Sequence, residues 1–482
     1  MKKQSYKLVL FSAMLLVICL QGCKKLIEID LPTDRITSES AFSADGTAIS
    51  FVTNTYTTLG SSSGLDGFLS LSFLTGLSSD ELKVLDAQNS DILSSTYKNK
   101  LSSMSPPEYW RTIYSMIYSV NVGIEKISES QSLSPQIKQY LLGETKFARA
   151  FFYFYLLNLY GDVPLTTTSD WRTNSSISRS SKDEVYLQII KDLKEAQVLL
   201  PDTYKSGDLK TNTIDRVRPT KWSALAMLSR VYLYRGNWDL SESVSTEVIN
   251  NPLFKLENLN SVFLRNSQEV IWSIQPTESG RNTSEAMKFV LTGTPSTDDY
   301  KPFFLNEDLL NAFENNDPRK ESWIESISAG NIYSYPSKYK ALETNGSAQT
   351  EYSVLLRLGE IYLNRAESRA RLGKNQDCIN DLNTIRRRAR GSRGETVLPD
   401  YVGSFTQEAL VSACLKERRI ELFSELGHRW FDLKRTNKID EVMNLAVIGK
   451  KTEWNNNWAL YPIPDPELRN NSALVGHQNP GY

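Results

Sequence analysis

The sequence predicts a mostly α-helical protein, a scaffold of tetratricopeptide-like helix pairs with loop-rich insertions that carry a few short strands. Apolar residues recur at helical spacing over several long segments. Three helix pairs share a layout of small residues, a turn glycine and a closing proline. Between 253 and 350, short β-like runs alternate with Gly, Pro, Asn and Asp. We therefore expect a single body over 38–482 with a loop-rich insertion at about 253–350.

Residues 1–22 are typical of a bacterial export signal, in which Lys2 and Lys3 precede an apolar stretch at 8–20. That stretch is shorter than the ~20 residues that span a bilayer. Residues 20–23 read Leu-Gln-Gly-Cys and resemble a lipobox, so we expect Cys23 to carry a lipid anchor. The alternative is a plain secretory signal with an incidental cysteine. Residues 23–37 then form a lipidated tether between the membrane and the body.

The helical segments follow in order along the body. A proline suited to a first turn opens the second of them, and a proline follows the third. Aromatic residues at 147–160 keep helical spacing, which favours core packing over a stacking platform. The predicted helices are 107–128, 135–160, 182–200, 220–234, 239–250, 354–372, 376–390 and 407–436.

The repeat is clearest at 220–252, where Tyr232, Gly236 and Trp238 fall at tetratricopeptide spacing and Pro252 is one position early. A glycine at the turn supplies the positive φ that ends the first helix. Small residues at the crossing let two helices approach closely. The alternative is a set of unrelated antiparallel helix pairs.

The overall composition excludes several classes of protein. The 482 residues carry 55 Lys+Arg and 56 Asp+Glu, so no strong field is present to hold nucleic acid, and no nucleic-acid partner is expected. Two histidines and four cysteines are too few for a disulfide framework or a Cys/His zinc cluster. We expect neither a metal nor a cofactor. Cys378 and Cys414 either form a disulfide or remain buried thiols.

Several segments resemble the hallmark sequences of the SusD/RagB family, and they follow one another in the family's order. The resemblance implies an outer-membrane lipoprotein that faces the cell exterior and captures oligosaccharides, or in some members peptides, without catalysis. It also implies a SusC-type TonB-dependent transporter as partner. The matching segments are 141–150 (LLGETKFARA), 159–165 (LYGDVPL), 218–221 (RPTK), 356–388, 416–422 (KERRIEL), 429–433 (RWFDL), 462–464 (PIP) and 478–482 (QNPGY).

Acidic residues keep a glycoside hydrolase open as an alternative, because that reaction needs only two carboxylates. Asp80 and Glu81, in the loop-like 75–86, are the most suggestive pair, although they also suit the N-terminus of a helix. Glu417, Glu421 and Glu425 share one helix face near several arginines, which favours a buried ion-pair network over a catalytic cluster. No known catalytic motif occurs in the structural context that it requires, so no catalytic residue is predicted.

The arginines at 386–388 and 390 are a second charged feature. They contact phosphate or a partner, or else they compensate a helix dipole in solvent, which is the favoured interpretation.

Aromatic residues outside the helical pattern are the predicted ligand contacts, because sugar rings pack on flat aromatic faces while polar neighbours bind the hydroxyl groups. Trp454 and Trp458, with the asparagines at 455–457, form another polar-aromatic loop that can equally serve a transporter interface. A structural lid that binds no nutrient is a further alternative. The predicted ligand-binding residues are Phe68, Asp80, Trp110, Tyr300, Trp323, Tyr333 and Tyr335.

Overall fold

The computed structural model describes residues 38–60, 68–85, 90–298, 301–344, 346 and 348–482. Within these ranges no helix is both long enough and apolar enough to cross a bilayer. The long helices are α3 (Asp45–Gly60), α6 (Tyr109–Glu129), α7 (Pro135–Tyr160), α9 (Lys182–Leu199), α10 (Lys221–Arg235), α11 (Trp238–Ile249), α15 (Leu358–Arg371), α16 (Asn375–Arg390), α17 (Gln407–Glu421) and α19 (Ile439–Lys450). The short helical elements are α2 (Ser38–Ala41), η2 (Phe68–Ser70), α4 (Leu71–Ser78), α5 (Asp91–Tyr97), α8 (Trp171–Asn174), α12 (Ser284–Phe289), α13 (Glu307–Leu310), α14 (Pro318–Trp323), α18 (His428–Arg435), η4 (Asn456–Ala459) and α20 (Asp465–Asn470).

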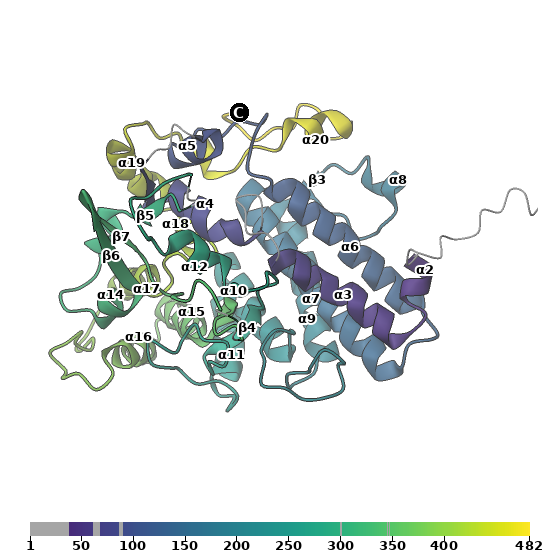
Figure 1. Ribbon diagram of the computed structural model, residues 1–482, viewed down its shortest axis with the longest axis horizontal. Helices are drawn as coiled ribbons and strands as arrows, with labels where there is room; N and C mark the ends of the chain where they lie inside the picture. Colours follow the sequence, from purple (N-terminus) through teal and green to yellow (C-terminus); the bar gives the residue numbers. More distant parts are fainter. Residues whose placement is uncertain (1–37, 61–67, 86–89, 299–300, 345, 347) are drawn as a thin grey trace, which may run out of the picture.

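The long helices pack side by side in an array that crosses the molecule (Figure 1). Helix α7 lies between α6 and α9, and α10 lies between α9 and α11. Helix α15 then contacts α11, α16 and α17. Each pair therefore packs mainly on its neighbours, as stacked helical repeats do. The predicted fold class, a mostly helical scaffold of paired helices, is confirmed.

The pair formed by α10 and α11 has the features that the repeat predicts. Gly236 ends α10 with a φ of +74°, and the indole of Trp238 packs against it. At the crossing, Ser229 Oγ lies 2.8 Å from Ser245 Oγ, and Ser241 Oγ donates to the Ser229 carbonyl at 3.1 Å. Small residues therefore bring these two helices into hydrogen-bond contact.

Three predicted boundaries are wrong. The segment 354–372 begins as a strand and becomes helical only at Leu358, because its first residues pair with another strand. The segment 407–436 is two helices, since Ser424 and Gly427 between them adopt positive φ. A side chain at Gly427 would place its Cβ 2.8 Å from Thr75 Oγ1, so this turn packs tightly on α4. The loop-like 75–86 begins within α4, whose residues are all buried.

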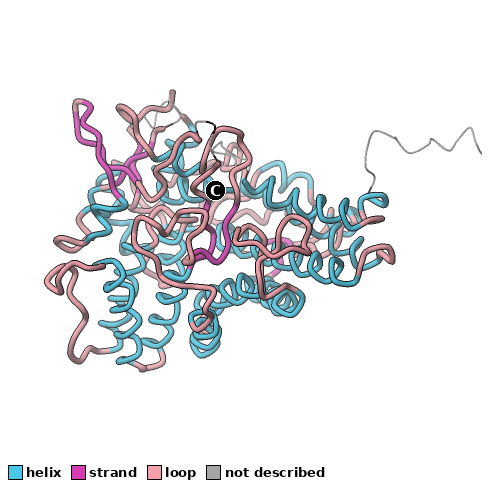
Figure 2. Tube along the Cα trace, turned by 60° about the horizontal axis from the view of Figure 1, so that its bottom comes forward, coloured by secondary structure: helices cyan, strands magenta, loops and turns pink. Residues whose placement is uncertain are grey.

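The strands of the described residues pair into four two-stranded antiparallel sheets, β1 with β5, β2 with β3, β4 with β8 and β6 with β7. The β4–β8 pair joins the stretch predicted as an insertion to the start of α15. The β6–β7 hairpin projects from the body (Figure 2). The strands are β1 (Leu82–Val84), β2 (Val163–Pro164), β3 (Arg179–Ser180), β4 (Val270–Ile274), β5 (Phe303–Leu305), β6 (Ile324–Ala329), β7 (Asn331–Pro336) and β8 (Ser353–Arg357).

The aromatic residues of α7 form the centre of the core, as their helical spacing predicts. Phe147, Phe151 and Tyr155 are at most 1% exposed. Trp272 of β4 packs edge to face on Phe147 and Phe151, with ring centroids 4.9 and 5.0 Å apart. The strand and the helical scaffold therefore share one core.

Candidate functional site

Three of the predicted ligand residues, Phe68, Trp110 and Trp323, lie in the core, with exposed fractions of 1%, 2% and 0%. Phe68 packs against the aromatic residues of α7. Trp110 packs edge to face on Tyr160 at a centroid distance of 5.1 Å, and Trp323 Nε1 donates to the Leu259 carbonyl at 2.9 Å. In this structure all three side chains serve packing, and their contact with a ligand stays a prediction.

The strands bring Asp80, Tyr333 and Tyr335 to one region of the fold. Asp80 precedes β1, which pairs with β5, and Phe304 of β5 packs on Tyr333 at a centroid distance of 5.3 Å. Tyr335 donates its hydroxyl hydrogen to Glu325 Oε2 at 2.9 Å. Both tyrosines are 6% exposed, and their role in ligand binding stays a prediction. Tyr300 and Cys23 lie outside the described residues, so their roles stay predictions as well.

Asp80 and Glu81 follow the end of α4 and precede β1, so their interpretation as a helix N-terminal pair is wrong. Burial raises the pKa of Asp80, but hydrogen bonds and charge from Arg429 and the charge of Arg419 outweigh it and lower the pKa to about 2. Each arginine donates to Asp80 at 2.7 Å. Burial, with the neighbouring charge of Asp80, raises the pKa of Glu81 to about 7. Adjacent carboxyl groups thus differ in protonation near neutral pH.

Glu81 leads to a prediction about stability and pH. Because its pKa is raised, the folded protein keeps a proton between pH 4.5 and about 7 that the unfolded chain has released. The stabilisation from this proton is complete below pH 4.5 and is lost as the pH rises through about 7. We expect Glu81→Gln, relative to the wild type, to gain stability as the pH rises from about 4.5 to about 8. Urea unfolding at both pH values measures this, and a difference that is independent of pH would contradict it.

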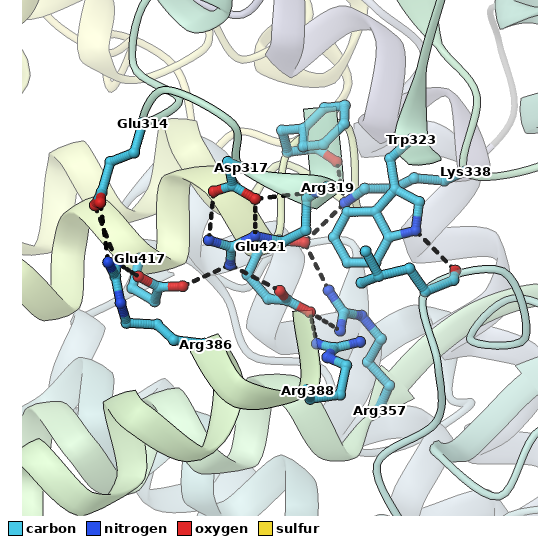
Figure 3. Close-up of polar contacts among 12 residues, drawn as sticks. Glu314, Asp317, Arg319, Trp323, Lys338, Arg357, Arg386, Arg388, Glu417 and Glu421 are labelled. Atoms are coloured by element: carbon cyan, nitrogen blue, oxygen red, sulfur yellow. Dashed lines mark hydrogen bonds and ion pairs between the residues drawn. The ribbon is translucent and has the colours of Figure 1, made fainter. Parts of the chain in front are cut away.

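Glu417, Glu421 and Glu425 belong to a buried ion-pair network, much of which is drawn in Figure 3. Glu421 is 0% exposed; it accepts from Arg357 Nη1 at 2.8 Å and from Arg319 Nη1 at 3.1 Å, and it also binds Arg388. These arginines come from β8, α14 and α16. The network therefore ties α17 to α14, α16 and β8, which confirms the ion-pair interpretation. The predicted common helix face is wrong for Glu425, which lies beyond the end of α17 at Glu421.

The arginine run at 386–390 contributes to this network. Arg386 pairs with Glu314 at 2.9 Å, and its side chain is 3% exposed. Arg388, whose side chain is 5% exposed, pairs with Glu421. Arg387 is 60% exposed and pairs with Asp400. Arg390, whose side chain is 8% exposed, also pairs with Asp400. The interpretation of the run as solvated compensation of the helix dipole is therefore wrong for Arg386, Arg388 and Arg390.

Cys378 and Cys414 are free thiols packed against each other between α16 and α17. Both are 0% exposed, and their Sγ atoms lie 3.6 Å apart. Burial raises the pKa of Cys414 well above the usual value, which disfavours a nucleophilic thiolate. Among the described residues, no group of three or more His, Cys, Asp or Glu side chains could hold a metal ion.

An open hollow of about 620 Å³ lies between α19 and the loop that contains η4. We call it the indole hollow. Its lining combines two half-buried indoles with two carboxylates and three amides. The lining residues are Trp454, Trp458, Asp440, Glu453, Asn444, Asn455 and Asn456.

Neighbouring side chains contact both indoles. Trp454 Nε1 donates to Asp440 Oδ1 at 2.7 Å, and its ring packs edge to face on buried Trp430 at a centroid distance of 6.2 Å. Lys100 Nζ lies 5.8 Å from the centroid of the Trp458 ring and 3.0 Å from Glu453 Oε1. Trp454 is therefore preorganised by its hydrogen bond and its contact with Trp430, which lowers the entropy cost of binding.

The lining of the indole hollow is complementary to a polyhydroxylated ligand, because flat apolar faces lie beside carboxylate and amide groups. Another hollow of about 890 Å³ lies beside α3, but its one aromatic lining residue is Tyr56, which is 8% exposed. The sequence indicated the loop around Trp454. It did not indicate Asp440, which stands 14 residues earlier in the chain and has no motif of its own.

Comparisons with known proteins identify the family of this chain. Residues 70–233 match the family model described as "Starch-binding associating with outer membrane", and residues 299–482 match the SusD family model. The chain belongs to the SusD/RagB family. A curated relative, SusD-like protein P38 of Formosa agariphila, is 28% identical over 77% of this SusD-family chain and 81% of the relative.

Solved structures agree on the fold. A SusD superfamily protein from Bacteroides vulgatus has a TM-score of 0.76 at 21% identity, and the match covers 91% of this chain and 99% of that protein. Surface glycan-binding protein A from Bacteroides thetaiotaomicron, in complex with laminarihexaose, has a TM-score of 0.74 at 18% identity over 90% and 99% of the two chains. At such identities the likeness establishes a SusD-type fold.

Proposed function

We propose that this SusD-family protein is a non-catalytic cell-surface protein that binds an oligosaccharide in the indole hollow. The observation that carries the proposal is the pair of indoles, Trp454 being preorganised, beside Asp440, Glu453 and the asparagine amides. Sugar rings stack on such faces while their hydroxyl groups bind the polar lining. The solved relative that holds laminarihexaose supports an oligosaccharide as ligand.

In this proposal Cys23 carries the lipid anchor at the outer membrane, the body faces the cell exterior, and a SusC-type TonB-dependent transporter takes up the captured oligosaccharide. The lipobox-like residues 20–23 and the outer-membrane description of the family model support this arrangement. Cys23→Ala is expected to release the protein from the membrane fraction. Affinity purification of the wild type is expected to recover the transporter.

Trp454→Ala is expected to weaken the binding of laminarihexaose about tenfold, because it removes one stacking face and frees Asp440 from its hydrogen bond. Isothermal titration calorimetry measures the affinity of both proteins. An unchanged affinity of the variant would overturn the assignment of this hollow.

Trp171→Ala is the matched control, because Trp171 is an indole with 66% exposure on α8, which lies far from α19 in Figure 1. Its removal is expected to leave the affinity unchanged. Failure of the wild type to bind any of a panel of glycans and peptides, with the transporter still recovered, would favour a structural lid. Release of shorter sugars from laminarihexaose would favour a glycoside hydrolase.

A further inference from the structure

Two cysteines of the body meet between α16 and α17. Cys378 Sγ lies 3.6 Å from Cys414 Sγ, and both residues are 0% exposed, although they stand 36 positions apart in sequence. The sequence has four cysteines, and the other two are Cys19 in the leader and Cys23 at the expected lipidation site. Cys378 and Cys414 are therefore the only cysteine partners that the body offers each other.

The packing of α16 on α17 holds the two sulfur atoms in van der Waals contact. A disulfide joins its sulfurs at about 2.05 Å, so they would have to approach each other by about 1.6 Å. Modest rotations of the two side chains about their Cα–Cβ bonds can supply such a movement. The fold thus places the two thiols where a bond between them needs no rearrangement of the helices.

The surroundings of the pair are those in which a cross-link adds stability. Both cysteines belong to a small core cluster, formed by α15, α16 and α17, that is separate from the main core. The segment 391–406 between α16 and α17 contains neither helix nor strand, and Gly391, Leu398 and Gly403 in it have positive φ. A bond between the two helices would reduce the entropy of this long connection in the unfolded chain.

The location of the protein supplies the oxidising conditions, and this step rests on the proposed function. A protein exported from the cytoplasm of a bacterium folds in a compartment where disulfides form and persist. Burial raises the pKa of Cys414 well above its usual value, so thiolate is scarce once the protein has folded. The bond therefore forms while the chain is still folding, and burial then protects it from reductants.

We propose that Cys378 and Cys414 form a structural disulfide that joins α16 to α17 in the exported protein. The reaction is thiol–disulfide exchange with an oxidising protein disulfide. One cysteine thiolate attacks a sulfur of that disulfide, displaces one thiolate and forms a mixed disulfide. The other cysteine thiolate then attacks the first Sγ and displaces the second thiolate. The pair loses two electrons and two protons, and the oxidant becomes a dithiol.

Peptide mapping of the protein from its host cells tests the proposal. The cells are lysed in denaturant with N-ethylmaleimide, which blocks every free thiol. Trypsin then releases the peptide 375–386 with Cys378 and the peptide 394–416 with Cys414. We expect mass spectrometry to find the two peptides as one linked species that dithiothreitol separates. Recovery of both peptides with N-ethylmaleimide attached, from protein in the membrane fraction, would overturn the proposal.

Cell fractionation reports separately on the proposed location. If the protein stays in the cytoplasm, the proposed function fails, and refolding of the full chain in a glutathione redox buffer decides about the disulfide. Linked peptides after refolding would support the bond, and two free thiols would overturn it. Neither result bears on the binding of laminarihexaose in the indole hollow.

Alanine variants distinguish a cross-link from two packed thiols. Cys378→Ala and Cys414→Ala each break the bond, so we expect each to raise the equilibrium constant of urea unfolding about 30- to 700-fold. The double variant is expected to add little to either single change, because the bond is already lost. Small losses that add up in the double variant would overturn the proposal. If a variant does not fold, the peptide map of the wild type decides.

Discussion

Replacing Arg357 with alanine is expected to lower the free energy of unfolding by about 3–5 kcal/mol, because it removes the shared partner of three buried carboxylates. Arg357 is 1% exposed and contacts Glu269 at 3.0 Å and both Glu421 and Glu425 at 2.8 Å. Burial makes the charge of each carboxylate costly without that partner. Chemical unfolding, followed by circular dichroism, measures the loss.

Arg387→Ala is the matched control for Arg357→Ala. Arg387 lies on α16 beside the network arginines Arg386 and Arg388, but its side chain is 60% exposed and pairs with Asp400. Solvent screens such a pair, so we expect a loss of less than about 1 kcal/mol. If Arg357→Ala also lost less than about 1 kcal/mol, the buried network would not be what holds α17 in place.

The helices could be predicted because their signal is local. In α16 the apolar positions recur along one face, whereas residues 147–157 of α7 are buried on every side. In both helices the predicted and observed ends differ by one residue or less. The prediction failed where pairing with a segment distant in sequence determines the backbone conformation. Residues 354–357 extend the apolar pattern of α15, but they form a strand because β4 lies beside them. The hydrophobic periodicity of either segment alone does not predict this pairing.

The candidate site was harder to predict because burial depends on the whole fold. Trp323 stands in a loop-rich stretch, and its sequence neighbours suggest exposure. The insertion folds back on the scaffold, so Trp323 is completely buried, with Lys338 Nζ 4.8 Å from its ring centroid. In the opposite sense, the helical pattern of α19 says nothing about Asp440, whose role follows from its contact with Trp454.

The buried ion-pair network shows how much can be predicted from the local spacing of charged residues. The positions of Glu417 and Glu421 indicated one charged helix face, and the structure confirms a network there. Their partners Arg319 and Arg357 stand 98 and 64 residues away in sequence, in α14 and β8. The sequence therefore indicates that these glutamates need cationic partners, but it does not identify which residues those partners are.

Trp272→Ala is expected to destabilise the protein by about 3–5 kcal/mol, because it leaves a large cavity where β4 meets α7. Trp272 is 1% exposed, and its ring contacts Phe147 and Phe151 at centroid distances of 4.9 and 5.0 Å. Its Nε1 donates to the Val217 carbonyl at 3.1 Å. Both the packing and this hydrogen bond are lost in the variant, and urea unfolding measures the total loss in the free energy of unfolding.

Trp272→Phe separates the two contributions, since it keeps a ring in the core and leaves the Val217 carbonyl unpaired. We expect it to lose about 1–3 kcal/mol, less than alanine. Because Trp272 joins the insertion to α7, each variant should unfold in one cooperative transition at lower denaturant than the wild type. Two separate transitions, with the helices of the scaffold persisting after the strands unfold, would mean that the insertion and the scaffold have independent cores.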